Sequence, residues 1–448
     1  MTSKSPTIRT ACRIALVLPV VLLGGCSASG GSHAASSDGQ RDLALIHDVM
    51  QRVKTSYVHP VDNTELTTDA LKGMLTRLDP HSDYMDAQEF HEFDSDTEGR
   101  FGGLGIEITN DDGVPKVIAP IDDTPAARAG IEPGDLIIRI DGQATNGMGL
   151  MKVVEILRGK PGTHVTITVA RAGRTPFDVP LTRRIIHVAS VKSALEPDGI
   201  GYARISSFTA ETQAELTAAI AHLKQQSGGH LNGFVLDLRD DPGGLLDAAV
   251  EVAGDFLDGG TVVTTRGRES DDDQAYTAPA KGDLIAGAPM AVLVNGASAS
   301  AAEIVAGALQ DRHRATVMGT PSFGKGSVQT IIPIGHGAIR LTTALYYTPS
   351  GRSIQGNGIT PDIAVGLPKD EQVANAVLTR EADLHGAFRN AGSLGKGAAA
   401  PAAPPPNAEA YARPIKLALI GTKNDAQLAA AVRQIEKRIA THPMPSRT

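Results

Sequence analysis

Two short segments of the sequence carry a serine and a lysine that together could perform acyl transfer. Ser300 lies in the segment Ser298-Ala-Ser-Ala-Ala-Glu303, and Lys325 lies further along in Gly324-Lys-Gly-Ser-Val-Gln329. A serine needs a base to become a nucleophile, and a lysine can be that base only while it is neutral. Burial lowers the pKa of a lysine and so favours the neutral form. The pair therefore predicts a Ser–Lys hydrolase.

Each half of this pair also has an ordinary structural interpretation. Ser300 and Glu303 have the spacing of a capping box, in which the hydroxyl only stabilises the start of a helix. Lys325 can equally be an exposed loop lysine. Two observations favour a catalytic role over these structural ones. In an extended segment Gln329 and Lys325 point to the same face, so the Gln329 amide can orient the lysine amine. The N–H of Ala301, at the start of a predicted helix, is a natural oxyanion donor.

A second oxyanion donor is expected from the segment Leu238-Arg-Asp-Asp-Pro-Gly-Gly244, directly after a buried strand. Paired glycines allow the backbone to approach a ligand closely, so the N–H of Gly243 or of Gly244 can serve. The alternative is a plain turn between strand and helix.

Other catalytic chemistries have weaker signals. No Gly-x-Ser-x-Gly elbow of an α/β-hydrolase occurs in the sequence. His81 and Asp83 suggest metal ligands, but neither a second ligand pair nor a His-Glu-x-x-His motif accompanies them. We therefore expect no metal and no organic cofactor.

The catalytic segments belong to an α/β pattern that extends over residues 185–390. A hairpin is expected across Gly335-His-Gly337. This alternation predicts an α/β core with a mixed sheet. The expected strands are 199–206, 234–238 and 291–294, and the expected helices are 212–225, 245–256 and 301–309.

Residues 99–184 predict a compact small domain of short strands, helices and glycine turns that resembles a PDZ domain. The resemblance rests on 103–106, on 129–135 and on 140–142. In PDZ domains the loop formed here by Gly103, Leu104, Gly105 and Ile106 offers backbone N–H groups to a peptide's C-terminal carboxylate, and the peptide adds a strand to the sheet edge. The alternative is that these glycines only make a tight turn.

The N-terminus predicts export. Residues 1–25 combine basic residues with an apolar run too short to span a bilayer, which is typical of a signal peptide. The segment Leu23-Gly-Gly-Cys26 resembles a bacterial lipobox, so we expect lipidation of Cys26 and a membrane-anchored periplasmic protein. A plain secretory signal is the alternative. Cys12 leaves with the signal peptide, so neither a disulfide nor a cysteine nucleophile is expected.

The remaining segments are predicted to form a tether, a linker and helices. Residues 26–40 predict a flexible tether and 391–408 an Ala/Pro-rich linker. Helical periodicity predicts a helical region at 41–98 and a helical C-terminal segment at 409–448. A formal net charge of −8 and the lack of tryptophan argue against a nucleic-acid-binding protein.

Together these segments resemble the C-terminal processing peptidases, also called tail-specific proteases. These are Ser–Lys serine peptidases with a PDZ domain inserted before an α/β catalytic core, and the resemblance covers about residues 41–385. It implies an α/β fold with a mixed-sheet peptidase core, an inserted PDZ domain and helical N- and C-terminal segments.

The resemblance also implies roles for single residues. Ser300 is then the nucleophile, Lys325 the general base and Gln329 its orienting partner. Gly243 and Ala301 then form the oxyanion hole, and Arg158 then transmits the position of the PDZ domain to the catalytic site. The family usually has Asn at 240 or 241 and Ser at 302, where this chain has Asp240, Asp241 and Ala302.

The implied partners are exported proteins or peptides with accessible, apolar C-termini. An adaptor protein and a second copy of the chain are further implied partners. The competing interpretation is a catalytically inactive PDZ scaffold or adaptor in the periplasm. The presence of Ser300, Lys325 and Gln329 together speaks against it.

Overall fold

The computed structural model describes residues 37–373, 379–389 and 415–441, and the chain divides into two compact units, 1–66 and 67–448. The predicted signal peptide, Cys26 and the predicted linker lie outside the described residues. Within the described part, no helix has the length and apolar character needed to cross a membrane.

The first unit contains helix α1 (Ser37–Ser56), and helix α2 (Asn63–Leu75) begins within it. Helix α1 starts inside the predicted tether. An acidic residue in its first turn, Asp38, favours a helix start because it complements the helix dipole. Large apolar side chains of α1, such as Leu43 and Val49, are more than half exposed.

The PDZ-like region forms a sheet in the order β3-β4-β5-β7-β8, with β6 paired to β5. A short loop at Leu104 and Gly105 separates two strands of this region, 100–103 and 106–111. Gly105 has a φ of +76°, which a continuous strand does not allow. The elements are β2 (Arg100–Gly103), β3 (Ile106–Asp111), β4 (Val114–Pro120), α4 (Pro125–Arg128), β5 (Leu136–Ile140), β6 (Gln143–Ala144), α5 (Leu150–Leu157), β7 (His164–Ala170), β8 (Phe177–Thr182) and β9 (Arg184–His187), which pairs with β2.

The peptidase core is built on a six-stranded sheet in the order β10-β11-β12-β15-β16-β19. Strand β10 is antiparallel to β11, and every other neighbouring pair is parallel. The predicted mixed sheet is therefore confirmed. Its strands are β10 (Val191–Glu196), β11 (Ile200–Ile205), β12 (Gly233–Asp237), β15 (Met290–Val294), β16 (Thr316–Gly319) and β19 (Ile363–Ala364).

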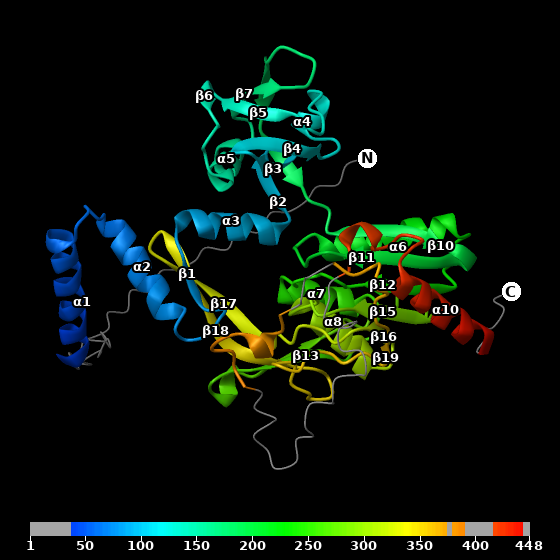
Figure 1. Ribbon diagram of the computed structural model, residues 1–448. Helices are drawn as coiled ribbons and strands as arrows, with labels where there is room; N and C mark the ends of the chain where they lie inside the picture. Colours follow the sequence, from blue (N-terminus) through cyan, green and yellow to red (C-terminus); the bar gives the residue numbers. More distant parts are fainter. Residues whose placement is uncertain (1–36, 374–378, 390–414, 442–448) are drawn as a thin grey trace, which may run out of the picture. The chain divides into compact units, whose positions relative to one another are not determined.

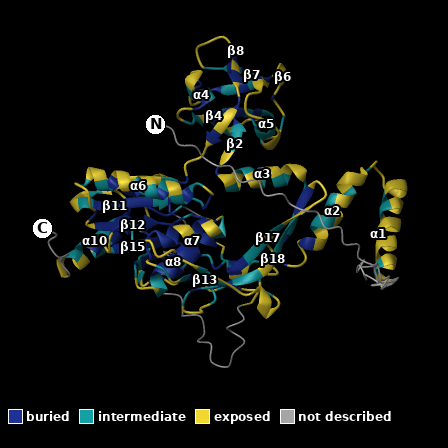
Figure 2. Cartoon of the chain, turned by 180° about the vertical axis from the view of Figure 1, so that it is seen from behind, coloured by how far each residue is buried: buried dark blue, intermediate teal, exposed yellow. Residues whose placement is uncertain are grey.

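Helices cover both faces of this sheet (Figure 1). Helices α6 (Thr212–Gln226), α7 (Leu246–Gly254) and α8 (Ala301–Asp311) pack on one face, and α10 (Ala426–Thr441) packs on the other. Successive residues of a strand point to opposite faces, so Leu236 packs with the first group and Val235 with α10. The central strands are accordingly buried throughout (Figure 2). The C-terminal segment thus completes the core.

A second sheet, of five strands, lies in the same unit and was not predicted apart from its hairpin. That hairpin is confirmed, with Ile334 paired to Gly337. The strands are β1 (Asp83–Met85), β13 (Thr261–Arg266), β14 (Gln274–Thr277), β17 (Ser327–Ile334) and β18 (Gly337–Tyr347). Helix α3 (Ala87–Glu98) and the short 3-10 helices Pro197–Gly199, Ser270–Asp272, Glu381–Asp383 and Leu417–Leu419 complete the described elements.

Candidate active site

Ser300 stands where strand β15 has ended and helix α8 is about to begin. Its backbone has φ +53° and ψ −113°, a conformation that non-glycine residues rarely adopt. Such strain is often found at functional residues. Ser298, by contrast, is fully buried, and its hydroxyl donates to the carbonyl of Leu238 at 2.7 Å. The geometry therefore favours Ser300 over Ser298 as the reactive serine.

A tyrosine that sequence reasoning missed contacts the Ser300 side chain. Burial raises the pKa of the Tyr346 phenol to about 12, while its hydrogen bond with the Ser300 side chain acts in the opposite direction. Tyr346 comes from strand β18 of the second sheet, and no pattern in the sequence indicates that this strand reaches the serine.

Gly243 lies directly against the serine segment. A Cβ at residue 243 would lie 2.8 Å from Ser300 Cβ and 2.8 Å from the backbone nitrogen of Ala301. A Cβ at Gly244 would instead meet the carbonyl oxygen of Phe208 at 2.0 Å. Of the two glycines that the sequence left open, Gly243 is therefore the one that lies beside Ser300.

Lys325 precedes strand β17 and is half-buried. Burial lowers the pKa of its amine below the ordinary value, and the nearby charge of Arg340 adds to this effect. The carboxyl groups of Glu381, Glu303 and Asp79 act in the opposite direction. The neutral amine that a general base requires is thus favoured. Among the described residues, no hydrogen bond joins this amine to the Ser300 hydroxyl.

Gln329 makes contacts other than the expected one with the lysine amine. Its Nε2 donates to Ser327 Oγ at 3.0 Å and to Thr342 Oγ1 at 3.1 Å. A register shift between Val328 and Gln329 places Gln329 opposite Thr342. Thr342 Oγ1 in turn donates to Asp79 Oδ1 at 3.1 Å, so this network reaches the turn that follows helix α2.

Glu303 joins the serine segment to the lysine segment. Its Oε2 accepts the backbone N–H groups of Ser300 and Lys325, each at 2.9 Å. The two nitrogens therefore lie no farther apart than twice this distance. Its Oε1 accepts Ser322 Oγ at 2.5 Å and the N–H of Gly324 at 2.7 Å. The capping-box spacing indicated the first of these contacts but none of the others.

The Glu303 carboxyl is completely buried, and burial raises its pKa to about 7 although all four donors favour the ionised form. An acid that receives four hydrogen bonds without exposure to solvent has little freedom to move. It fixes the backbone on which both candidate catalytic residues stand.

The turn that contains His81 and Asp83 contributes structure near the lysine. His81 Nε2 lies 2.9 Å from Glu381 Oε2, and Glu381 is fully buried. Within the described residues, no group of three or more histidine, cysteine, aspartate or glutamate side chains is arranged to hold a metal ion.

The predicted peptide-binding loop begins the edge strand of the PDZ-like sheet. The carbonyls of Leu104 and Gly105 accept the N–H groups of Ala126 and Ile121, at 3.0 and 2.9 Å. In the part of the chain that the structure describes, the N–H groups of Leu104 and Gly105 donate no hydrogen bond. Strand β3 begins at Ile106, and of the strands that the structure describes it pairs only with β4. Free donors beside a free strand edge are what a peptide C-terminus needs.

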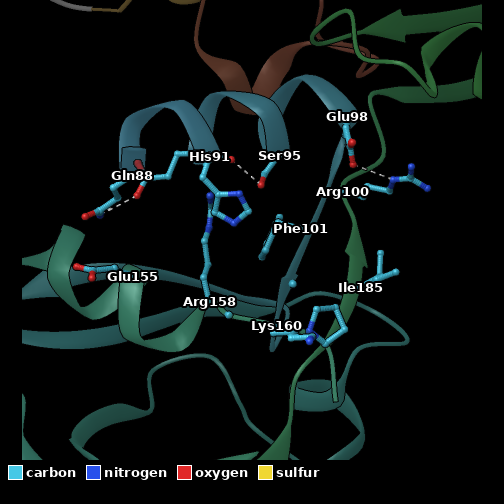
Figure 3. A pocket seen from close by; sticks show the side chains of 14 residues that line it. Gln88, His91, Ser95, Glu98, Arg100, Phe101, Glu155, Arg158, Lys160 and Ile185 are labelled. Carbon is cyan, nitrogen blue, oxygen red and sulfur yellow. Dashed lines mark hydrogen bonds and ion pairs between the residues drawn. The ribbon is translucent and has the colours of Figure 1, made fainter. Parts of the chain in front are cut away.

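Arg158 lines a pocket of about 660 Å³ between helix α3 and the PDZ-like region (Figure 3). Its guanidinium lies over the ring of Phe101, 4.5 Å from the centroid, and 3.5 Å from Asp96 Oδ1 in helix α3. Gln88, His91 and Ser95 of the same helix also line this pocket. Arg158 therefore connects the PDZ-like region to α3.

Comparison with known proteins gives a consistent result. Residues 199–365 match peptidase family S41, residues 116–171 match the PDZ domain, and residues 27–89 match the N-terminal domain of the activating protease CtpB. The carboxy-terminal processing protease CtpA of Bacillus subtilis is 34% identical over 357 residues, which cover 79% of this chain and 75% of the relative. The solved photosystem II D1 C-terminal processing protease is 29% identical, with a TM-score of 0.42, and the match covers 74% of this chain and 93% of that chain.

A carboxy-terminal-processing protease of Bartonella bacilliformis is 50% identical over 361 residues, which cover 80% of this chain and 83% of the relative. The chain therefore belongs to the carboxy-terminal processing proteases, serine-type peptidases of family S41 that carry a PDZ domain.

Proposed function

We propose that this protein is an endopeptidase that cleaves exported proteins near their C-termini through Ser300 and Lys325. The observation that carries the proposal is the Glu303 carboxylate, which binds the backbones of both residues. The lowered pKa of Lys325 and the position of Gly243 against Ser300 support the same assignment.

The proposed reaction begins with proton transfer. Neutral Lys325 Nζ takes the proton of Ser300 Oγ while Oγ attacks the carbonyl carbon of the scissile peptide. The N–H groups of Ala301 and Gly243 stabilise the negative oxygen that forms. Protonated Lys325 then gives its proton to the leaving amine, and a water molecule hydrolyses the acyl-enzyme. Because the hydroxyl and the amine are not yet hydrogen-bonded, they must approach each other before the first step.

We assign the supporting role in this reaction to Gln329. Its amide is held by Ser327 and Thr342, on the strand that follows Lys325. An amide at this position can accept from the lysine amine once the amine turns toward the serine.

The proposed substrate is a polypeptide whose C-terminal carboxylate binds the loop 103–106. The unused N–H groups of Leu104 and Gly105 and the free edge of β3 support this site. An apolar last residue fits because Leu104 belongs to the apolar core of this region and Ile106 packs against it.

We further propose that Arg158 transmits the position of the PDZ domain to the catalytic residues. Arg158 contacts Asp96 of α3, and α3 contacts β18. Strand β18 pairs with β17, which carries Gln329. Replacing Arg158 with alanine should lower kcat for substrates with a free C-terminus. Lys160→Ala, which alters another residue of the same pocket, is the matched control. Unchanged tail-dependent activity in Arg158→Ala would remove this assignment.

The location that we propose is the periplasmic side of a bacterial membrane, with a lipid on Cys26. The sequence Leu23-Gly-Gly-Cys26 supports it. Fractionation of cells that produce Cys26→Ser tests the anchor, because this variant should move from the membrane fraction to the soluble fraction. A wild type found only in the soluble fraction would contradict it.

The decisive experiment uses an unstructured peptide with an apolar C-terminus. Wild type should cleave it, and Ser300→Ala and Lys325→Ala should lose at least about 10³-fold in kcat, as removal of a catalytic group does in other serine peptidases. Lys325→Arg is the matched control for charge, since arginine keeps the cation but cannot act as a base at neutral pH. It should be as inactive as Lys325→Ala. If wild type cleaves no faster than these variants, the chain is an inactive PDZ scaffold.

A further inference from the structure

The two candidate oxyanion donors differ in whether their N–H groups already donate a hydrogen bond. Within the described residues the N–H of Ala301 has no hydrogen-bond partner. The N–H of Gly243 donates to Asp241 Oδ1 at 2.8 Å. A substrate oxygen that enters between them therefore meets one available donor and one that is already bound to a carboxyl group.

The loop holds Asp241 firmly in this place. Its side chain is completely buried, and its backbone carbonyl accepts the N–H of Ala299 at 2.9 Å. The other carboxyl oxygen, Oδ2, is buried and has no hydrogen-bond partner in the part of the chain that the structure describes. Among the described residues, the bond from the Gly243 N–H is thus the only hydrogen bond that this carboxyl group accepts.

No cation neutralises Asp241 among the described residues. Arg204 of β11 faces it without forming an ion pair, and Arg239 is bound to Asp237 and Asp425. Asp237 faces the same carboxyl group, and Asp240 next to it is also acidic. Burial raises the pKa of Asp241 well above the ordinary value, and Asp237 adds to this, whereas Arg204 and the Gly243 N–H oppose it.

We propose that Asp241 acts as a latch on the oxyanion hole. Its carboxyl group accepts the Gly243 N–H in competition with the substrate, and its negative charge repels the oxyanion. This inference rests on the proposed function, because it concerns the same hole. A hydrogen bond to a carboxylate is about twice as strong as one to a neutral acceptor. The loss of one oxyanion donor costs about 10²–10³ in kcat in a serine peptidase.

The latch predicts a definite dependence on pH. A protonated Asp241 is a weaker acceptor and carries no charge, so the hole opens when this group is neutral. As the pH rises through the pKa of Asp241, the group ionises, the latch closes and kcat falls. The titration of Lys325 has the opposite effect on kcat, because the lysine amine becomes a base only as the pH rises. Wild type should therefore have a bell-shaped profile of kcat against pH.

The test compares wild type with Asp241→Asn, which keeps the size of the side chain and an acceptor oxygen but removes the charge. We expect kcat to rise about tenfold with KM within about twofold, since the competing hydrogen bond becomes an ordinary neutral one. The falling limb of the pH profile should disappear. The matched control is Asp240→Asn, because Asp240 Oδ1 accepts from Asn295 Nδ2 rather than from Gly243. An equal rise of kcat in both variants, or an unchanged profile in Asp241→Asn, would overturn the latch.

A second measurement tests the latch in wild type alone, so it stays informative even if Asp241→Asn does not fold. A peptide aldehyde forms a tetrahedral adduct with Ser300 whose oxygen occupies the hole. Its affinity for wild type should weaken as the pH rises through the falling limb of kcat, and Asp241→Asn should bind it about tenfold more tightly. An affinity that is independent of pH contradicts the latch. A wild type that neither cleaves the peptide nor binds the aldehyde contradicts the proposed function instead, so the two failures are distinguishable.

Discussion

Glu303 accepts a hydrogen bond from the backbone N–H of Lys325 at 2.9 Å, and this contact ties the lysine segment to the helix that follows the serine. The same carboxyl oxygen holds the N–H of Ser300, and the acid is fully buried. Leaving a buried donor without its hydrogen-bond partner costs about 1–3 kcal/mol of folding stability. Moving the two candidate catalytic segments apart would therefore carry a penalty, which holds the backbones of Ser300 and Lys325 together.

Replacing Glu303 with glutamine should lower kcat by about two orders of magnitude and leave KM nearly unchanged, as expected for a small misplacement of catalytic groups. The amide presents one acceptor oxygen and one donor group to four donors, so some of them must lose their partner. The measurement is steady-state cleavage of a peptide, together with urea unfolding.

Glu215→Gln is the matched control for this change. Glu215 Oε2 also accepts several donors, from Ser190 and Val191, but it lies on helix α6. Both variants should lose stability, whereas only Glu303→Gln should lose kcat. Equal loss of kcat in the two variants would reduce Glu303 to a general stabilising residue.

Arg340 should set the pH at which the enzyme becomes active. Burial lowers the pKa of Lys325, and the positive charge of Arg340 lowers it further. Removing that charge in Arg340→Gln raises the lysine pKa. Because the base must be neutral, the rising limb of kcat/KM should then move to higher pH. Arg352→Gln, which removes an arginine paired with Asp311, provides the control. A rising limb that stays in place in Arg340→Gln would show that the limb does not report Lys325.

Gly243→Ala should abolish activity while the protein remains folded. The new methyl group would lie 2.8 Å from Ser300 Cβ, which is closer than two carbon atoms can pack, and Gly243 has a φ of +94°. The left-handed backbone alone costs an alanine roughly 1–2 kcal/mol.

Gly228→Ala separates these two effects. Gly228 has a φ of +80°, and a Cβ there would meet nothing within 4 Å. It therefore imposes the same backbone cost without the clash at the serine. Circular dichroism melting should show a loss of stability in both variants, larger in Gly243→Ala because of the clash, and peptide cleavage should be lost in Gly243→Ala alone. Cleavage by Gly243→Ala at the wild-type rate would place the oxyanion donor elsewhere.

The sequence was most informative where the signals are local. The hairpin across Gly335-His336 and the buried strands of the core follow from turn residues and apolar runs, and each is present. The place of Ser300 between a buried strand and a helix also follows from the sequence, because the apolar run of the strand ends and the helical pattern begins there. Spacing along the chain was enough for these features.

Spacing along the chain could not predict the contacts that form only in the folded chain. Glu303 appeared only as a capping residue because two of its four partners lie in the lysine segment and a third, Ser322, lies just before it. The side-chain partners of Gln329 depend on a bulge that moves its register, which periodicity cannot reveal. Tyr346 reaches Ser300 from another sheet. Only this last contact depends on the position of one sheet against another, whereas the contacts of Glu303 and Gln329 depend on a loop conformation and on a bulge within one hairpin.

The pair of Arg239 and Asp425 makes the C-terminal helix part of the catalytic core, and it yields the last prediction. Both side chains are fully buried and 2.6 Å apart, and Arg239 immediately precedes the loop that carries Gly243. Burial opposes the ionisation of Asp425, but its bonds with Arg239 outweigh burial and lower its pKa. The stability that this acid contributes is therefore present above the ordinary Asp range and is lost as the pH falls through the lowered pKa.

Asp425→Asn should destabilise the protein by about 3–5 kcal/mol at neutral pH, because it leaves a buried guanidinium short of charge compensation. Arg352→Ala, which breaks a partly exposed ion pair with Asp311, should cost only about 0–1 kcal/mol. The measurement is urea unfolding between neutral and acid pH, where the difference between wild type and Asp425→Asn should shrink as Asp425 becomes protonated. A small and pH-independent cost would mean that helix α10 is held by its apolar face alone, and that residues 426–441 do not support the oxyanion loop through this charge.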